Sequence, residues 1–243
     1  MVVKMFILSS PIFHVPSVNP FYKFIILKMS EEVEWGELAL PNTPLFRTTL
    51  PKHIIDYVWE RVEEAKINNI DHKHSLAGNI SKSLEMYDPE NYFWNEVMFP
   101  LTSHIVDNVP GIWLPNIDHS VKVTPFLRWW VNFSKQTEFN PLHAHGGCLS
   151  FVIWLKIPTH WKDQHELPIS KTANIPAASD FTFTYSNILG QHCEYPIHMS
   201  LEMENQMVFF PASLRHQVYP FYECDQERIS VAGNILWNIK LTD

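Results

Sequence analysis

Six short apolar stretches fill the second half of this 243-residue chain, and they limit the possible folds more than any other feature. They are rich in β-branched and aromatic residues and are separated by polar, proline-bearing segments, a pattern typical of β-strands. Two helical patterns come before them. We therefore predict an α+β fold, mainly β, with helices packed outside a β-sandwich or barrel. The predicted strands lie at 126–133, 149–157, 180–186, 196–203, 207–212 and 228–240.

The first helical pattern opens at Pro51 and continues to about Lys66, because Ile54, Val58 and Val62 recur at the spacing of one helix face. A second helix is expected over 91–109, kinked or split by its internal proline. A short strand with turns is expected within 38–50. The polar segment 160–178 is expected to be a long loop over one end of the barrel.

Residues 1–28 differ in composition from the rest of the chain. They carry three lysines and no acidic residue, and prolines interrupt each apolar run before it reaches membrane-spanning length. We interpret this segment as an extension upstream of a natural start at Met29, or as a loosely packed arm. Residues 29–243 are then a single domain, with helical support over 38–110 and a β core over 122–240.

Charge and cysteine content restrict the partners and the compartment. The net charge of −8 argues against a surface that binds duplex nucleic acid. The three cysteines are too few and uneven for a disulfide framework, so we expect a reducing compartment, the cytoplasm, and no membrane association. The sequence does not indicate an oligomeric state.

His143 and His145 stand one residue apart at the start of an apolar run. In an extended chain, residues i and i+2 project from the same face, so both imidazoles can approach one point. His216 is the best third ligand, because it begins a strand after the turn in "FFPASLRH". Arg228 follows twelve residues later at the head of another strand. This ordered set predicts a metal site with a cation nearby.

The same residues resemble a known family. "FNPLHAHGGCLSFVIWLKIP" and "FFPASLRHQVYPFYECDQERISVAGNI" are similar to segments of the Fe(II)/2-oxoglutarate-dependent oxygenases, in particular to a type common in marine phages and bacteria. The resemblance covers about Phe126 to Asn238 and extends more weakly to Leu38. It implies a double-stranded β-helix of the jelly-roll or cupin-like kind. It also implies a dioxygenase that acts as a hydroxylase. This enzyme would work in the cytoplasm, or in the cytoplasm of a host if the chain is phage-encoded.

The resemblance assigns roles to individual residues. His143, His145 and His216 would hold Fe(II), and Arg228 would bind the far carboxylate of 2-oxoglutarate with help from Ser230 and Asn132. A guanidinium is suited to this task because its N–H groups match a carboxylate in pairs. The other partners would be O2 and an unidentified substrate, a protein residue such as proline or a small metabolite. No catalytic residue is implied beyond the metal ligands.

One position departs from the family pattern. Most members have Asp or Glu where this chain has His145, and Asp118, Glu138 and Asp180 are the candidates if a carboxylate joins the site from elsewhere. The departure keeps an alternative open, a cupin-like three-histidine metal protein that does not use 2-oxoglutarate. Such a protein would be a dioxygenase, an isomerase or lyase, or a small-molecule binder. It would leave Arg228 without a role.

Overall fold

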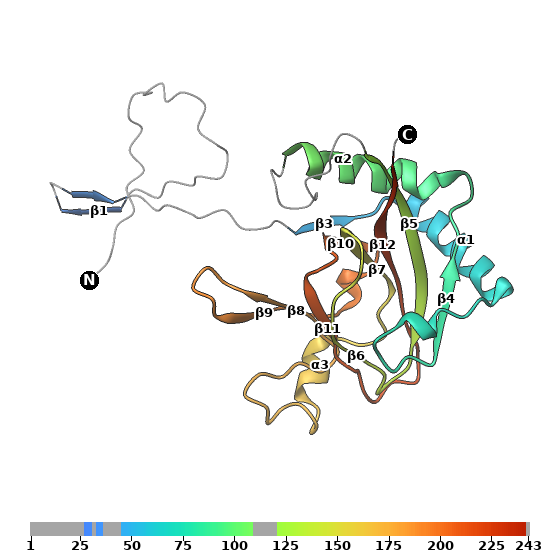
Figure 1. Ribbon diagram of the computed structural model, residues 1–243. Coiled ribbons are helices and arrows are strands. Elements are labelled where there is room, and N and C mark those ends of the chain that lie inside the picture. Colours follow the sequence, from blue (N-terminus) through green and yellow to red (C-terminus); the bar gives the residue numbers. More distant parts are fainter. Residues whose placement is uncertain (1–26, 31–32, 36–44, 109–120, 242–243) are drawn as a thin grey trace. The chain divides into compact units, whose positions relative to one another are not determined.

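The apolar runs of the second half form antiparallel sheets, which confirms the prediction of a mainly β fold with few helices (Figure 1). The computed structural model describes residues 27–30, 33–35, 45–108 and 121–241. The chain divides into two compact units, Met1–Thr43 and Pro44–Asp243. In the first unit the described residues form one antiparallel pair, β1 (Leu27–Ser30) and β2 (Val33–Trp35). Most of the segment 1–28 lies outside the described residues, so its boundary at Met29 stays a prediction.

The larger sheet of the second unit has six strands in the order β3-β10-β7-β12-β5-β4, and all neighbours are antiparallel. Strands β5 and β12 pair over their full length of 14 residues and are the longest strands of this sheet. The bounds are β3 Phe46–Thr49, β4 Lys82–Met86, β5 Val121–Ser134, β7 Leu149–Lys156, β10 Gln206–Pro211 and β12 Arg228–Leu241.

The smaller sheet has four antiparallel strands in the order β6-β11-β8-β9. Apolar side chains from both sheets form one buried cluster, so the two sheets pack face to face. Val152 and Trp154 contribute to this cluster from the larger sheet, and Phe181 and Phe183 contribute from the smaller one. The bounds are β6 Asn140–His143, β8 Phe181–Ser186, β9 His192–Ile197 and β11 Arg215–Val218.

The position of β7 between two apolar clusters explains why its sequence is apolar without alternation. Its odd-numbered residues, such as Phe151 and Ile153, belong to the cluster beneath the helices, whereas Val152 and Trp154 belong to the cluster between the sheets. A strand that is covered on both faces reads as a continuous apolar run. The even-numbered residues Val152 and Trp154 therefore face the space between the two sheets.

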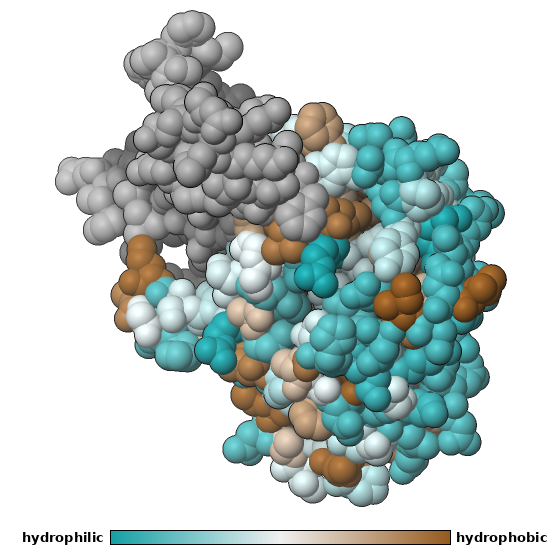
Figure 2. Space-filling model, turned by 45° about the vertical axis from the view of Figure 1, so that its right-hand side comes forward, coloured by the Kyte–Doolittle hydropathy of each residue, from teal (hydrophilic) through white to brown (hydrophobic). Residues whose placement is uncertain are grey.

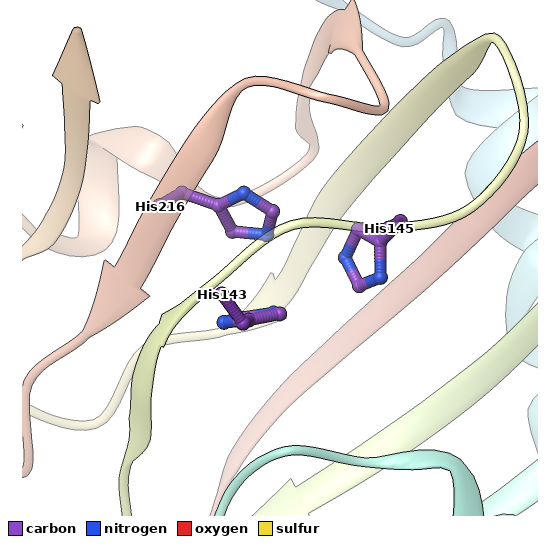
Figure 3. Close-up of side chains that lie close together, drawn as sticks. All are labelled: His143, His145 and His216. Carbon is purple, nitrogen blue, oxygen red and sulfur yellow. The ribbon is translucent and has the colours of Figure 1, made fainter.

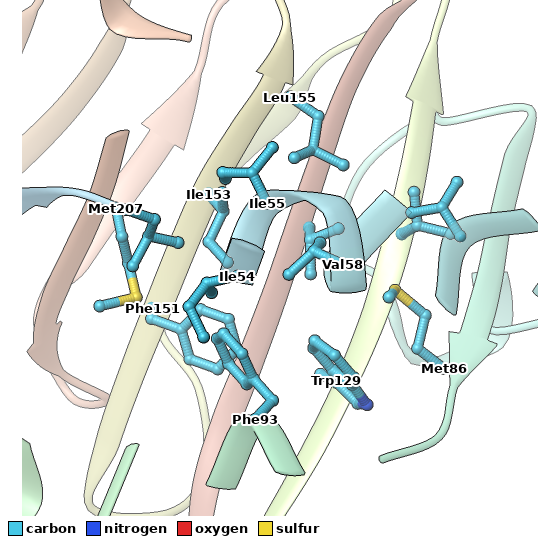
Figure 4. Close-up of a cluster of buried hydrophobic side chains, with 14 of the residues drawn as sticks. Ile54, Ile55, Val58, Met86, Phe93, Trp129, Phe151, Ile153, Leu155 and Met207 are labelled. Carbon is cyan, nitrogen blue, oxygen red and sulfur yellow. The ribbon is translucent and has the colours of Figure 1, made fainter. Parts of the chain in front are cut away.

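Helix α1 (Lys52–Asn68) confirms the first helical prediction. Its buried face includes Ile54, Ile55 and Val58, which pack on the outer face of the larger sheet against residues such as Phe151 and Trp129 (Figure 4). The helix ends at the left-handed residue Asn69, whose N–H donates to the carbonyl of Ala65.

The second helical prediction is also confirmed for the described residues. A π-helical turn, η3 (Trp94–Met98), leads into α2 (Phe99–Asn108). Pro100 lies in the first turn of α2, where a proline is tolerated because the first N–H groups of a helix have no partner within it. The helical run is therefore continuous from Tyr92 to Asn108, with a π-helical turn directly before the proline in place of the predicted kink or split. Short 3-10 turns occur at Lys73–Ser75 (η1), Pro89–Asn91 (η2) and Leu201–Met203 (η4).

Two sequence predictions need correction, and one strand was missed. The predicted strand 196–203 is wrong: β9 ends at Ile197, and a 3-10 turn follows. The predicted loop 160–178 contains the helix α3 (Trp161–Glu166). Strand β4, at the edge of the larger sheet, was not predicted at all.

The surface shown in Figure 2 is mostly hydrophilic over the second unit, and hydrophobic residues occur there in small separate groups. Among the described residues, no helix combines the length and the apolar character needed to cross a membrane.

Candidate metal centre

Three histidines converge at one end of the two sheets, as the sequence predicted. His143 ends β6, His145 follows two residues later, and His216 lies in β11 as the direct register partner of His143. One nitrogen of each imidazole lies within 4.8 Å of the nitrogens of the other two. The ring centroids are 4.9 Å apart for His143 and His145, 4.3 Å for His143 and His216, and 5.0 Å for His145 and His216. Figure 3 shows the three rings turned toward a common space.

Backbone carbonyls orient two of these rings. Nδ1 of His143 lies 2.7 Å from the carbonyl oxygen of Pro141, and Nδ1 of His216 lies 2.9 Å from that of Leu214. An Nδ1–H group that donates to a carbonyl leaves Nε2 with its lone pair, which is the tautomer that a metal ligand needs. The ring of His145 has no such partner among the described residues and instead contacts Trp130 edge-on.

Burial keeps all three imidazoles neutral. Desolvation lowers the pKa of His145 to about 4 and the pKa of His216 to about 3, and it also lowers the pKa of His143. The mutual repulsion of the rings adds to the effect at His145 and His216. Neutral imidazoles bind a metal ion without first losing a proton at neutral pH.

The carboxylates considered from the sequence do not join this cluster. Glu138 accepts hydrogen bonds from the backbone N–H groups of Ser81 and Lys135. Asp180 contacts two other histidines. Asp118 lies outside the described residues. Within the described chain, the cluster therefore offers three imidazoles and no carboxylate.

Arg228 lies in the same pocket as the three histidines. Its side chain is buried, with 4% of the residue exposed. Among the described residues it forms no direct ion pair, Glu227 included, although the charge of Asp180 raises its pKa. One nitrogen donates to the carbonyl of Ser179 at 3.0 Å and another to the carbonyl of Tyr219 at 3.3 Å. Burial lowers the pKa of Arg228 to about 10, so the guanidinium stays charged at neutral pH. A buried cation of this kind favours an anionic ligand.

Asn132 and Ser230 lie side by side in the same pocket. They are direct register partners across β5 and β12, and both line the cavity that contains Arg228. Asn132 is 5% exposed, and its Oδ1 has no hydrogen-bond partner among the described residues. The arrangement leaves polar groups of both residues available to a ligand.

The segment 75–80 forms a wall of the pocket that the sequence did not reveal. Its residues Ser75, Leu76, Ala77 and Ile80 line the cavity. Gly78 makes this possible, because a methyl group there would overlap the backbone of Phe139 and the side chain of Asn140. The glycine in "LAGNI" was the only signal of this close approach. The remaining lining residues, from the two sheets and the loop after β6, are Trp130, Ser134, Asn140, Ala144, Phe151, Val152, Trp154, Phe181, Phe210, Val218 and Ala232.

Residues 128–234 match the model of a family described as "Putative 2OG-Fe(II) oxygenase". The matched region begins in β5, ends in β12, and contains the three histidines and Arg228. The matched region, which is less than half of the chain, is similar to the 2OG-Fe(II) oxygenase family. This family of oxidoreductases implies Fe(II) and 2-oxoglutarate, and the described chain offers a histidine-rich candidate site for the metal.

Two solved structures are similar to this chain at low sequence identity. A Pseudomonas putida prolyl-4-hydroxylase is 11% identical, with a TM-score of 0.46, over 80% of this chain and 92% of that chain. An oxidoreductase of the 2OG-Fe(II) oxygenase family from Burkholderia pseudomallei is 15% identical, with a TM-score of 0.30, over 46% of this chain and 43% of that chain. Comparison with curated proteins gave no match.

Proposed function

We propose that this chain is a non-haem Fe(II)- and 2-oxoglutarate-dependent dioxygenase that hydroxylates its substrate. The observation that carries the proposal is the placement of three neutral imidazoles and one buried, unpaired guanidinium in a single pocket. The two facing antiparallel sheets are consistent with a double-stranded β-helix, the architecture that we propose for this domain.

His143, His145 and His216 would hold the iron. Their donor atoms come within 4.8 Å of one another, and the Nδ1 contacts of His143 and His216 direct Nε2 toward the shared space. Three nitrogen ligands on one side of Fe(II) leave other coordination positions open. Since the ligand set carries no negative charge, it would hold the ion less tightly than a set that includes a carboxylate.

Arg228 would bind the far carboxylate of 2-oxoglutarate, and Asn132 and Ser230 would assist it. When bound, Fe(II) and 2-oxoglutarate supply the oxidative chemistry, in which decarboxylation of the 2-oxo acid accompanies oxidation of a substrate C–H bond. Because the three histidines and Arg228 line the same pocket, a cosubstrate held by both would lie between them. Two of the guanidinium N–H groups donate to carbonyls, and the remaining donors have no hydrogen-bond partner among the described residues.

Aromatic residues exclude water around the candidate ligands. Phe181 stacks on the ring of His216, with centroids 5.4 Å apart and an interplanar angle of 18°, and Phe210 contacts the same ring edge-on at 5.0 Å. This apolar surrounding strengthens the attraction between Arg228 and an incoming carboxylate, because the local dielectric constant is low.

The substrate of the proposed hydroxylase is a protein residue such as proline or a small metabolite. The three cysteines of the chain are all free, which is consistent with our proposal of a cytoplasmic protein. Mass spectrometry of candidate peptides and metabolites, incubated with the loaded protein, would identify the substrate through the gain of one oxygen atom.

The experiment that tests the proposed function is the conversion of 2-oxoglutarate to succinate. We expect succinate to form when the protein is supplied with Fe(II), ascorbate and O2, and to disappear when Fe(II) is withheld or when both His143 and His216 are replaced by alanine. A cupin-like metal protein would bind the ion but leave 2-oxoglutarate unconsumed, and this outcome would favour the alternative.

A further inference from the structure

A second group of metal-ligating side chains lies outside the pocket described above. His165 belongs to α3, Asp180 directly precedes β8, and His198 directly follows β9. One donor atom of each residue lies within 4.8 Å of the others. We propose that these three residues form a second metal site, which binds a divalent transition-metal cation such as Zn(II) and fastens α3 to the smaller sheet.

The distances within the cluster fit ligands that share one ion. Oδ2 of Asp180 lies 3.1 Å from Nε2 of His165 and 2.9 Å from Nδ1 of His198. In a tetrahedral site, zinc bonds of about 2.0–2.2 Å place neighbouring ligand atoms roughly 3.3–3.6 Å apart, so the side chains, which are now within hydrogen-bond distance, would separate by a few tenths of an ångström to admit the ion. Both imidazoles approach the same carboxylate oxygen, as expected when three ligands surround one point.

The other carboxylate oxygen and the burial of Asp180 also favour a cation. Asp180 is 1% exposed, and its Oδ1 has no hydrogen-bond partner among the described residues. Burial raises the pKa of Asp180, although the two histidines act in the opposite direction. Arg228 is near enough for Asp180 to raise the pKa of the guanidinium, but no lysine or arginine in the described chain forms a direct ion pair with this carboxylate. A divalent cation held between Asp180, His165 and His198 would supply a positive charge in direct contact.

The surroundings suit a site that is partly open to solvent. Trp161 stacks on His198 with centroids 4.3 Å apart and an interplanar angle of 17°, and it contacts His165 edge-on at 5.3 Å. The side chain of His198 is 39% exposed, so water can reach the ion and complete its coordination. Two imidazoles and one carboxylate with an open position are a donor set that Zn(II) accepts.

The second site would also hold in place a backbone carbonyl that contacts Arg228. The carbonyl of Ser179, next to Asp180 in the chain, accepts a hydrogen bond from the guanidinium. An ion that fixes Asp180 to His165 and His198 therefore also fixes this acceptor. This effect on cosubstrate binding rests on the proposed function, whereas the metal site itself does not.

The test is a Zn(II) titration of the metal-free full-length chain, with bound metal measured after equilibrium dialysis. We expect two equivalents for the wild-type chain and one for His198→Ala. A variant with both His143→Ala and His216→Ala should also retain one. His192→Ala, which removes an exposed histidine from the neighbouring strand β9, should still bind two and serves as the matched control.

The second site is refuted if His198→Ala binds as much Zn(II) as the wild-type chain, or if the variant lacking His143 and His216 binds none. Should His198→Ala fail to fold, His165→Gln provides the same comparison, with circular dichroism to verify its fold. Loss of the first site alone gives a different result: the wild-type chain and the variant lacking His143 and His216 would then both bind one equivalent. That result would contradict the proposed iron site and leave the second site intact.

Discussion

Replacement of Arg228 by methionine separates the two candidate functions. The guanidinium is buried, donates to the carbonyls of Ser179 and Tyr219, and has no carboxylate partner among the described residues. Phe221 lies against it, with the guanidinium carbon 5.2 Å from the ring centroid. Methionine is apolar and flexible enough to occupy much of this space.

We expect the replacement to cause a large loss of affinity for 2-oxoglutarate and a small loss of stability of the fold. Removing one partner of a buried charge pair costs about 2–5 kcal/mol, so the dissociation constant of 2-oxoglutarate should rise by roughly 30-fold to several thousand-fold. The two lost hydrogen bonds destabilise the fold by about 1–3 kcal/mol. Part of that cost is offset because the variant no longer buries a charge.

Isothermal titration of the anaerobic Fe(II)-loaded chain with 2-oxoglutarate measures the effect. Iron binding should stay nearly unchanged, because Arg228 is not one of the proposed ligands. Arg128→Met is the control, since Arg128 lies on the same sheet but is exposed and outside the pocket. If Arg228→Met binds 2-oxoglutarate as tightly as the wild-type chain, the reasoning from burial and charge is refuted.

Three further predictions concern the same pocket. Asn132→Ala and Ser230→Ala should each weaken 2-oxoglutarate binding by about 1 kcal/mol, the net value of one hydrogen bond, in the same titration; unchanged affinity in both would remove them from the cosubstrate site. Gly78→Ala should lower the free energy of unfolding by about 1–3 kcal/mol in urea denaturation, because its methyl group overlaps the backbone of Phe139, and a neutral effect would show that segment 75–80 adapts. Metal-free protein should lose stability as the pH falls below about 6.5, since the folded-state pKa of His216 is about 3 and the unfolded chain then binds the proton more readily. By about pH 5 this histidine alone contributes a loss of about 2 kcal/mol, which His216→Phe should abolish in urea denaturation at each pH.

Periodic patterns predicted most of the fold. The three-to-four spacing of Ile54, Val58 and Val62 predicted α1, and the same residues are buried in it. The apolar runs predicted β7 and β10 well. The prediction failed at 196–203, because Met199 and Met203 are buried from a turn instead of a strand, and a buried turn can have the same apolar spacing as a strand.

The candidate metal centre was predictable because its geometry is local or set by strand register. His143 and His145 are two residues apart, and His216 pairs directly with His143 across β6 and β11. The cluster around Asp180 was not predictable, since its histidines lie in a short helix and just beyond a strand end. Their convergence depends on tertiary packing, which leaves no periodic signal in the sequence.

The central claim is that iron and 2-oxoglutarate meet in one pocket. Anaerobic titration of the metal-free chain with Fe(II), followed by 2-oxoglutarate, tests it most directly, because chelation of Fe(II) by a 2-oxo acid produces a weak visible charge-transfer band. The account predicts this band in the wild-type chain and its absence when His143 and His216 are replaced by alanine. Fe(II) binding without a band at saturating 2-oxoglutarate would contradict the account.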